Sequence, residues 1–154
     1  MSATLSPEVI DLLNNESSIK VLATIDGDGL PHVVVRNSIY AADDGTLHLP
    51  ELLESSTTNR NLLGGLWFDR KVAISLLSKD GRNFQIKGKP VKTHVGGALF
   101  QQHYLKVRES LGNVGLAAVW VIEPEEVRDE NFAVLKARQS AERPTLTHLD
   151  QLVK

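Results

Sequence analysis

Cysteine is absent from this chain of 154 residues, and aromatic residues make up only 5% of it. Without cysteine there is no disulfide framework, no thiolate nucleophile and no thiolate-bound metal. Any redox chemistry must therefore come from a bound cofactor, because the chain has no redox-active thiol of its own.

Excess charge of one sign and long apolar runs are also missing. The net charge is -2 and the isoelectric point is about 6.2, which argues against nucleic acid as a partner, because phosphate backbones require a basic surface. No apolar run approaches the roughly 20 residues needed to span a bilayer, and the first residues lack the features of a signal peptide. We expect a cytoplasmic protein with no membrane partner.

β-Branched and apolar segments separated by turn residues indicate a mainly β protein of the α+β class. Glycine-containing turns at Asp26–Gly29, Asp43–Gly45 and Asp80–Gly81 predict hairpins. Pro50 and Pro124 are expected to end strands. The predicted strands are 18–25, about 31–40, 47–49, 71–77, 83–93 and 115–122, with a bulge or edge at Gly88 and Pro90.

Helices are predicted at the ends of the chain and between strands. Ser6 and Pro7 are a strong helix start. Further helices are expected at 61–67, 97–111 and 130–141, with a last short one containing Leu146, Leu149 and Val153. The result is a small six-stranded antiparallel barrel with flanking helices in a single domain, residues 1–154. Its core spans about 18–123 and a helical extension about 130–154.

A run of hydroxyl side chains opens the helix that follows the third strand. Ser55, Ser56, Thr57 and Thr58 stand there, with Arg36 and Arg60 as nearby cations. Hydroxyls, free backbone N–H groups and a guanidinium at a helix N-terminus can hold a phosphate. The same run can equally be a polar loop with an N-cap, and Arg36 can equally be a solvated or ion-paired side chain.

The region from about 18 to 93 resembles the FMN-binding split-barrel superfamily, which includes pyridoxamine 5′-phosphate oxidase and small bacterial FMN-binding proteins. The similarity rests on the order of four segments: ATIDGDGLPHVV, NSIYAADDGTLHL, SSTTNRNLLGGLWFDRKVAISLL and RNFQIKGKPVK. It implies that one strand runs beside the flavin ring, that the hydroxyl run meets the phosphate, and that one amide reaches the flavin from the partner subunit. The residues so implied are Val35, Arg36 and Asn37 for the ring, Ser55, Ser56, Thr57, Thr58 and Asn61 for the phosphate end, and Asn83 for the partner contact.

The resemblance further implies a homodimer with FMN sites at its interface and a flavin-dependent oxidoreductase. The substrate would be an unknown small molecule, with a nicotinamide or another small reductant as donor. Thr57 and Thr58 stand where family members commonly carry lysine or arginine, and the segment VWVIEPEEVRDENF lacks the basic pattern of true pyridoxamine phosphate oxidases. A non-enzymatic flavin carrier or sensor, a deazaflavin protein and a flavin-free barrel for protein interaction remain alternatives.

Other candidate sites have weaker patterns. The five histidines show no metal-ligand spacing, so no metal site is expected. His103 lies on the apolar stripe of its helix and is expected to be buried and hydrogen-bonded. Trp67 and Trp120 are expected in the core or an interface. The sequence identifies no catalytic proton-transferring residue.

Overall fold

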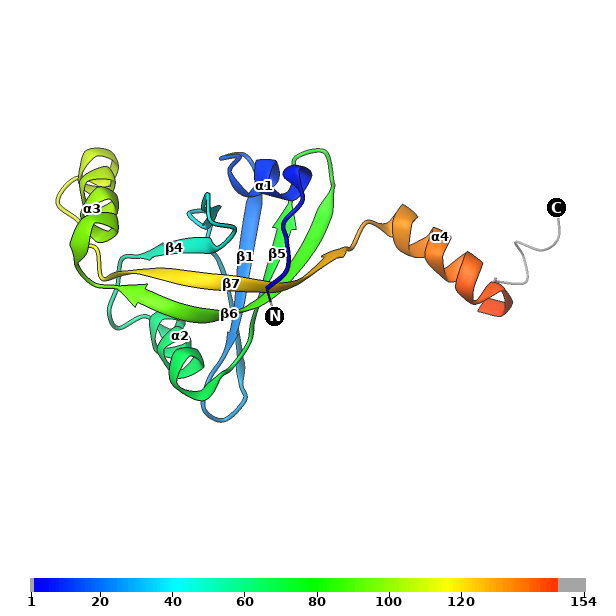
Figure 1. Ribbon diagram of the computed structural model, residues 1–154, viewed down its shortest axis with the longest axis horizontal. Coiled ribbons are helices and arrows are strands. Elements are labelled where there is room, and N and C mark those ends of the chain that lie inside the picture. The colour runs from blue at the N-terminus through cyan, green and yellow to red at the C-terminus, as the bar shows by residue number, and fades with distance from the viewer. Residues whose placement is uncertain (1, 147–154) are drawn as a thin grey trace.

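A computed structural model describes residues 2–146 of the chain as one curled antiparallel sheet with helices at its margins (Figure 1). The strands are β1 (Ile19–Ile25), β2 (Pro31–Val35), β3 (Tyr40–Ala41), β4 (Leu47–Glu51), β5 (Val72–Leu77), β6 (Asn83–His94) and β7 (Ala118–Asp129). The helices are α1 (Pro7–Leu13), α2 (Thr57–Phe68), α3 (Gly97–Leu111) and α4 (Phe132–Glu142), followed by a 3-10 turn, η1 (Pro144–Leu146).

The seven strands follow the order β2-β1-β5-β6-β7-β4-β3. Every neighbouring pair is antiparallel. Strand β7, the last in residues 2–146, therefore lies between β6 and β4 and joins the two halves of the sheet. Side chains on the concave side form one continuous apolar core that includes Leu22, Ile74, Ile86 and Trp120.

The predicted count of six strands is wrong because the expected strand 31–40 is two strands, β2 and β3. Lys20 explains the interruption. Its backbone N–H donates to Asn37 Oδ1 at 3.0 Å, and its Nζ donates to the carbonyls of Asn37 and Ile39 at 2.8 and 3.1 Å. The chain leaves the sheet at these residues, and the Ile39 side chain becomes fully buried.

Both prolines that were expected to end strands lie within them. Pro50 pairs with Val119 between β4 and β7. Pro124 pairs with Gly88 beside a register shift between β6 and β7. The register shifts between Lys87 and Gly88, and between Pro90 and Lys92, confirm the predicted bulge, and they allow β7 to continue to Asp129.

Helix α2 begins at Thr57, within the hydroxyl run 55–58 that was expected to open it. Ser56 is its N-cap and accepts a hydrogen bond from the Asn59 backbone N–H at 2.9 Å. With this start, the helical repeat places one set of residues on the core side: Thr58, Asn61, Leu62 and Gly65.

Helices α3 and α4 lie at opposite ends of the molecule (Figure 1). The predicted bounds of α3, 97–111, are confirmed. Helix α4 projects away from the sheet, and none of its residues is buried. The predicted last helix is represented by η1; its other residues, Leu149 and Val153, lie outside the described part of the chain. Within residues 2–146 no helix has the length and apolar character needed to cross a membrane.

Candidate functional site

The convex face of β2, β1 and β5 is an exposed apolar surface. Val33 is 61% exposed and Val35 57%, on the edge strand β2. In register, Val35 lies opposite Val21, which lies opposite Ser75. Ile19 and Leu77, a pair on the same face, are 45% and 39% exposed. An apolar surface of this kind is a common feature of an interface or a ligand site.

This exposed sheet face becomes polar toward β6 and β7. Ser75 lies opposite Gln85, and Gln85 opposite Arg128. Lys87 lies opposite Glu126, and their charged groups are 3.9 Å apart. The apolar part is therefore confined to β2, β1 and β5, the side of the sheet that carries the predicted flavin strand.

Arg36, at the end of β2, is turned toward the protein. Its Nη2 lies 3.5 Å from Glu51 Oε2, and the Glu51 side chain is only 4% exposed. Glu51 Oε1 also accepts a hydrogen bond from the Leu53 backbone N–H at 3.2 Å. The pair lines a hollow of about 330 Å³, which is also bounded by Ser38, Pro50, Leu52, Leu53 and Val114. The positive charge of Arg36 is thus already compensated by a carboxylate.

The four hydroxyl residues at the start of α2 are not equivalent. Ser55 and Thr57 are exposed, whereas Ser56 caps the helix and Thr58 is completely buried. Buried Thr58 could not touch a phosphate with its side chain unless the first turn of α2 moved. The first backbone N–H groups of the helix have no intrahelical backbone acceptor, and the Asn59 N–H already donates to Ser56. The hydroxyls of Ser55 and Thr57 and the N–H groups of Thr57 and Thr58 are therefore the donors that can meet a phosphate.

The predicted amide contacts have partners in the fold. Asn61 is buried and donates from Nδ2 to Thr24 Oγ1 at 3.0 Å. Asn37 Oδ1 accepts from the Lys20 N–H, as described above. Asn83 lies on the exposed sheet face opposite Leu77, and its Oδ1 is 3.5 Å from Ser75 Oγ. Both Asn37 and Asn61 therefore hold the barrel together.

Asn83 is remote from Val35 within one chain. Strands β1 and β5 lie between β2 and β6, and three spacings of about 4.8 Å make roughly 14 Å. The structure therefore brings Val35 and Arg36 to the end of β2 and ties that end to β4, but it leaves Asn83 on the far side of the exposed sheet face.

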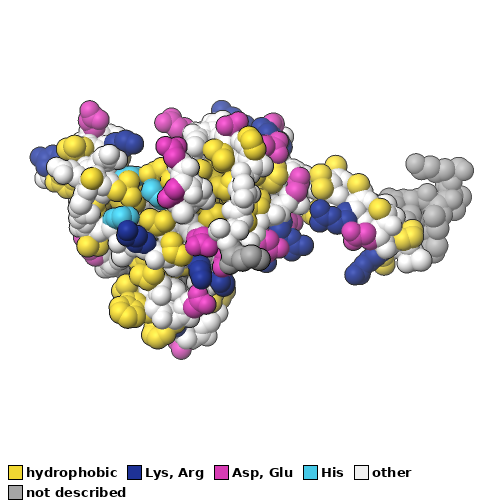
Figure 2. Space-filling view, in the orientation of Figure 1, with side chains coloured by type: hydrophobic (Ala, Val, Ile, Leu, Met, Phe, Trp, Pro, Cys, Tyr) yellow, Lys and Arg dark blue, Asp and Glu magenta, His cyan; other side chains and the backbone are white. Residues whose placement is uncertain are grey.

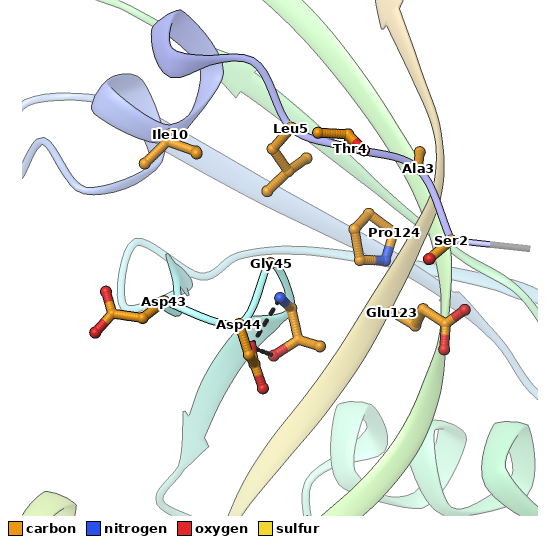
Figure 3. Close-up of a pocket in the computed structure, with 11 residues that line it drawn as sticks. Ser2, Ala3, Thr4, Leu5, Ile10, Asp43, Asp44, Gly45, Glu123 and Pro124 are labelled. Carbon is orange, nitrogen blue, oxygen red and sulfur yellow. Dashed lines mark hydrogen bonds between the residues drawn. The ribbon is translucent and has the colours of Figure 1, made fainter.

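Other surface features lie apart from these residues. A hollow of about 430 Å³ lies between the N-terminal segment and the β3–β4 turn, and none of the predicted flavin residues lines it (Figure 3). Asp44 in that turn accepts hydrogen bonds from Thr46 (Figure 3). On α2, Leu63, Trp67 and Phe68 are 45%, 75% and 70% exposed, and hydrophobic side chains crowd this end of the molecule (Figure 2). Trp120, in contrast, is in the core.

One polar cluster was not predicted from the sequence. The Tyr40 hydroxyl lies 3.1 Å from His48 Nδ1 and 2.8 Å from His103 Nε2, between the sheet and α3. Histidine side chains gather on this side of the molecule in Figure 2. His103 is buried and hydrogen-bonded, as predicted. For His48, the one sequence signal was the alternation of side chains along β4, which places it on the face opposite to Leu47 and Leu49. Within residues 2–146 no group of three or more His, Asp or Glu residues is arranged to hold a metal.

Several solved structures share this architecture, and the regions that match cover most of each solved chain. HupZ of Group A Streptococcus matches with a TM-score of 0.68 and 21% identity over 84% of this chain and 96% of its own. A Lactobacillus delbrueckii protein, provisionally described as a pyridoxamine 5′-phosphate oxidase, gives 0.60 and 23% over 81% and 93%. An FMN-binding protein from Syntrophomonas wolfei gives 0.63 and 15% over 80% and 84%.

This chain has the fold of the FMN-binding split-barrel superfamily. The predicted resemblance is thereby confirmed, and the identities of 15–23% establish the fold alone. HutZ of Vibrio cholerae, described as a heme storage protein, has the same fold (TM-score 0.56, 14% identity, 82% of this chain and 95% of its own). Structures described as FMN-binding and as heme storage proteins therefore share one fold. No family model and no curated protein matches the sequence.

Proposed function

We propose that the chain binds FMN between two copies of itself and acts as a flavin-dependent oxidoreductase on a small substrate. The observation that carries this proposal is the exposed sheet face, where Val33 and Val35 leave more than half of their surface uncovered. A planar flavin ring and a second copy would together cover this apolar surface.

The proposed site offers apolar contacts for the flavin ring and hydrogen-bond donors for the phosphate, but no cation within the hydroxyl run. The valines of β2 offer an apolar support for the ring. Ser55 and Thr57 offer exposed hydroxyls, and the N-terminus of α2 offers backbone donors and a positive dipole end for the phosphate. No lysine or arginine lies in the hydroxyl run, and Arg36 is paired with Glu51. We therefore expect phosphate to be held mainly by hydrogen bonds and to contribute modestly to affinity.

FMN, when bound, supplies acceptance and donation of electrons. The chain's own residues would bind and orient it: Val35 would pack against the ring, Ser55 and Thr57 would hold the phosphate, and the second copy would exclude water. Asn83, roughly 14 Å from β2 within one chain, would reach the flavin held mainly by the other chain. Arg36, Asn37, Ser56 and Asn61 would shape the site from behind, through the contacts described above, and Thr58 would do so as a buried side chain.

The test is equilibrium titration of the purified full-length protein with FMN, riboflavin, FAD and heme, followed by visible absorption. FMN should bind more tightly than riboflavin because only FMN carries the terminal phosphate, and more tightly than FAD because the sequence has no GxGxxG turn for a pyrophosphate. Reduction of bound FMN by NADH or NADPH, with transfer to an acceptor, distinguishes an enzyme from a carrier or sensor. Binding of heme alone, or of no cofactor, would refute the proposal.

A further inference from the structure

Helix α4 extends away from the sheet and covers none of it (Figure 1). None of its residues is buried, and within residues 2–146 its main contact is the short turn η1 that follows it. Phe132, its first residue, is 79% exposed. A helix of 11 residues is marginal in water by itself, because most helical stability in proteins comes from packing of an apolar face. We therefore expect α4 to be covered by something other than the sheet of its own chain.

The base of α4 is fixed to the start of β6. The Asn83 backbone N–H donates to Asn131 Oδ1, and the Glu130 N–H donates to the Asn83 carbonyl, both at 3.0 Å. Asn131 in turn donates from its N–H to Asp129 Oδ1 at 2.9 Å. Its side chain therefore joins the helix to the sheet and does not cap the helix. The arm, as we call α4, thus begins at a defined point beside Asn83.

This point lies at the margin of the exposed sheet face. Asn83 is paired with Leu77 on β5, and Leu77 is paired with Ile19 on β1. In the proposed dimer, Asn83 of one chain reaches the flavin that lies along β2 of the other. The arm of each chain then begins beside β2 of the second copy, a step that rests on the proposed function.

Strand β2 offers a surface of matching length. It is an edge strand, so one side of its backbone has no neighbouring strand within the described sheet, and Val33 and Val35 on it are exposed. Natural sheets commonly cover such an edge with a helix or a loop. The five residues of β2 extend about 17 Å, and the 11 residues of the arm extend about 16 Å. One arm can therefore lie along the whole strand.

The charges of the arm and of the rest of the chain are opposite. Residues 132–146 hold three basic side chains, Lys136, Arg138 and Arg143, and one acidic side chain, whereas residues 1–131 hold 13 basic and 17 acidic side chains. None of the three basic side chains forms an ion pair within the described part of the chain. They can therefore pair with carboxylates of a second copy.

Two exposed carboxylates lie near the ends of β2. Asp28 is in the hairpin before the strand, and Glu54 follows Leu53, which borders the same hollow as Arg36 at the end of the strand. Neither carboxylate forms an ion pair with another residue of 2–146. A basic arm along β2 would bring cations close to both of them.

We propose that α4 is an exchanged arm, which in the homodimer packs along β2 of the second copy. Phe132 anchors it at the base against the exposed valines, and the basic side chains pair with the carboxylates at the ends of the strand. Because each chain gives one arm and receives another, two equivalent contacts form about a two-fold axis. The contact covers the open edge beside the flavin site and holds the two chains that form this site together.

Cross-linking between two single-cysteine chains tests the exchange. The protein has no cysteine of its own, so one chain can carry Ala137→Cys in the middle of the arm and the other Val33→Cys in the middle of β2. After the two differently tagged chains are mixed and allowed to exchange, a short bismaleimide should join them into a covalent dimer that carries both tags. Such a product cannot form within one chain.

A matched control keeps the exposure of the second cysteine similar. Leu105 on α3 is 58% exposed, against 61% for Val33, and α3 lies at the opposite end of the molecule from the arm (Figure 1). Mixing Ala137→Cys with Leu105→Cys should therefore give much less product. Equal yields with the two partners, or no product with Val33→Cys, would overturn the exchanged arm.

Sedimentation equilibrium measures the contribution of the arm to the dimer. Phe132→Ser should raise the dissociation constant of the dimer by about tenfold or more, the usual scale for an aromatic residue central to an interface. It should leave the circular dichroism unchanged, because Phe132 is exposed within one chain. Phe68→Ser on α2, where the side chain is 70% exposed, is the control and should dimerise like the wild type. A dissociation constant that Phe132→Ser leaves unchanged would contradict the proposal.

Both experiments are made without flavin, so their outcome separates the arm from the proposed function. A covalent product between the arm and β2 in a protein that binds no FMN would support the arm and refute the flavin proposal. A dimer that binds FMN but gives no such product would refute the arm alone.

Discussion

Arg36 and Glu51 form an ion pair that joins the end of β2 to the end of β4, with 3.5 Å between Nη2 and Oε2. The carboxylate is almost fully buried, whereas the guanidinium side chain keeps 29% of its surface exposed. The pair therefore links β2 to β4 beside the proposed flavin strand. Because Arg36 is paired with Glu51, its charge is not free to bind the phosphate.

Removing the Arg36 side chain should destabilise the fold more than removing the negative charge of Glu51. Arg36→Ala leaves the Glu51 carboxylate buried without its cation and should lower the free energy of unfolding by about 2 to 4 kcal/mol. Glu51→Gln keeps the shape without a buried charge and should cost clearly less. Urea denaturation of both variants measures the difference; equal losses would show that the pair acts by packing alone.

The two threonines at the start of α2 should respond differently to truncation. Thr57→Ala removes an exposed hydroxyl and should weaken FMN binding by about 1 to 2 kcal/mol with little effect on riboflavin, the scale of a hydrogen bond to a charged group. Thr58→Ala removes a buried hydroxyl that has no hydrogen-bond partner within residues 2–146, so it should leave the ratio of FMN to riboflavin affinity unchanged. A Thr58 variant that loses only FMN affinity would show that α2 shifts when the cofactor binds.

Shared flavin sites can be detected by subunit mixing. A chain with Asn83→Ala is combined with a chain disabled at Ser55 and Thr57. If each site draws on both chains, one site of the heterodimer carries both defects and the other neither, so about half of the heterodimer sites should regain FMN binding. No recovery, or a monomer at micromolar concentration, would contradict the shared interface.

Gly88 should tolerate no side chain. A Cβ there would collide with the backbone carbonyl of Glu123 on β7, at the register shift between the strands. Gly88→Ala should therefore destabilise the fold by about 2 to 4 kcal/mol, since the obstacle is backbone and cannot rotate away. Gly115→Ala is the control, because nothing lies within 4 Å of its Cβ position. Thermal unfolding of the two variants provides the comparison.

His48 should make stability depend on pH. Burial lowers the pKa of His48 below its ordinary value of 6.5, with His103 and His94 adding to the effect against Asp44. The unfolded chain therefore binds a proton before the folded chain does, so stability should fall as the pH drops below about 6.5. His48→Gln should flatten this dependence in denaturation curves at pH about 8 and about 5, and an unchanged slope would contradict it.

The sequence predicted the parts of the fold that depend on local signals. Glycine turns marked the three hairpins, and the apolar stripe of 97–111 marked α3, because both patterns arise from neighbouring residues. Pro50 and Pro124 were misread because a proline can remain in a sheet where its missing N–H is not needed or where the register shifts. Neither condition is visible until the partner strand is known.

The candidate site was less predictable for a related reason. Thr58 and Asn61 belong to the core side of α2, and the side of this helix that packs on the sheet is set by tertiary contacts. The partners of Arg36 and Asn37, Glu51 and Lys20, are distant in sequence. The hydroxyl run indicates a phosphate site. Which of its residues are exposed, which one caps the helix and which one is buried depends on tertiary packing.

The position of β7 between β6 and β4 has a consequence for how this chain acquires its fold during synthesis. Strands β3 and β4 pair only with each other until Ala118–Asp129 appears, because β7 is the strand that links them to the rest of the sheet. The larger half, β2-β1-β5-β6, can assemble from nascent chain that has already left the ribosome. The smaller half must wait, and its apolar residues Leu47 and Leu49 need protection from aggregation until the last strand arrives.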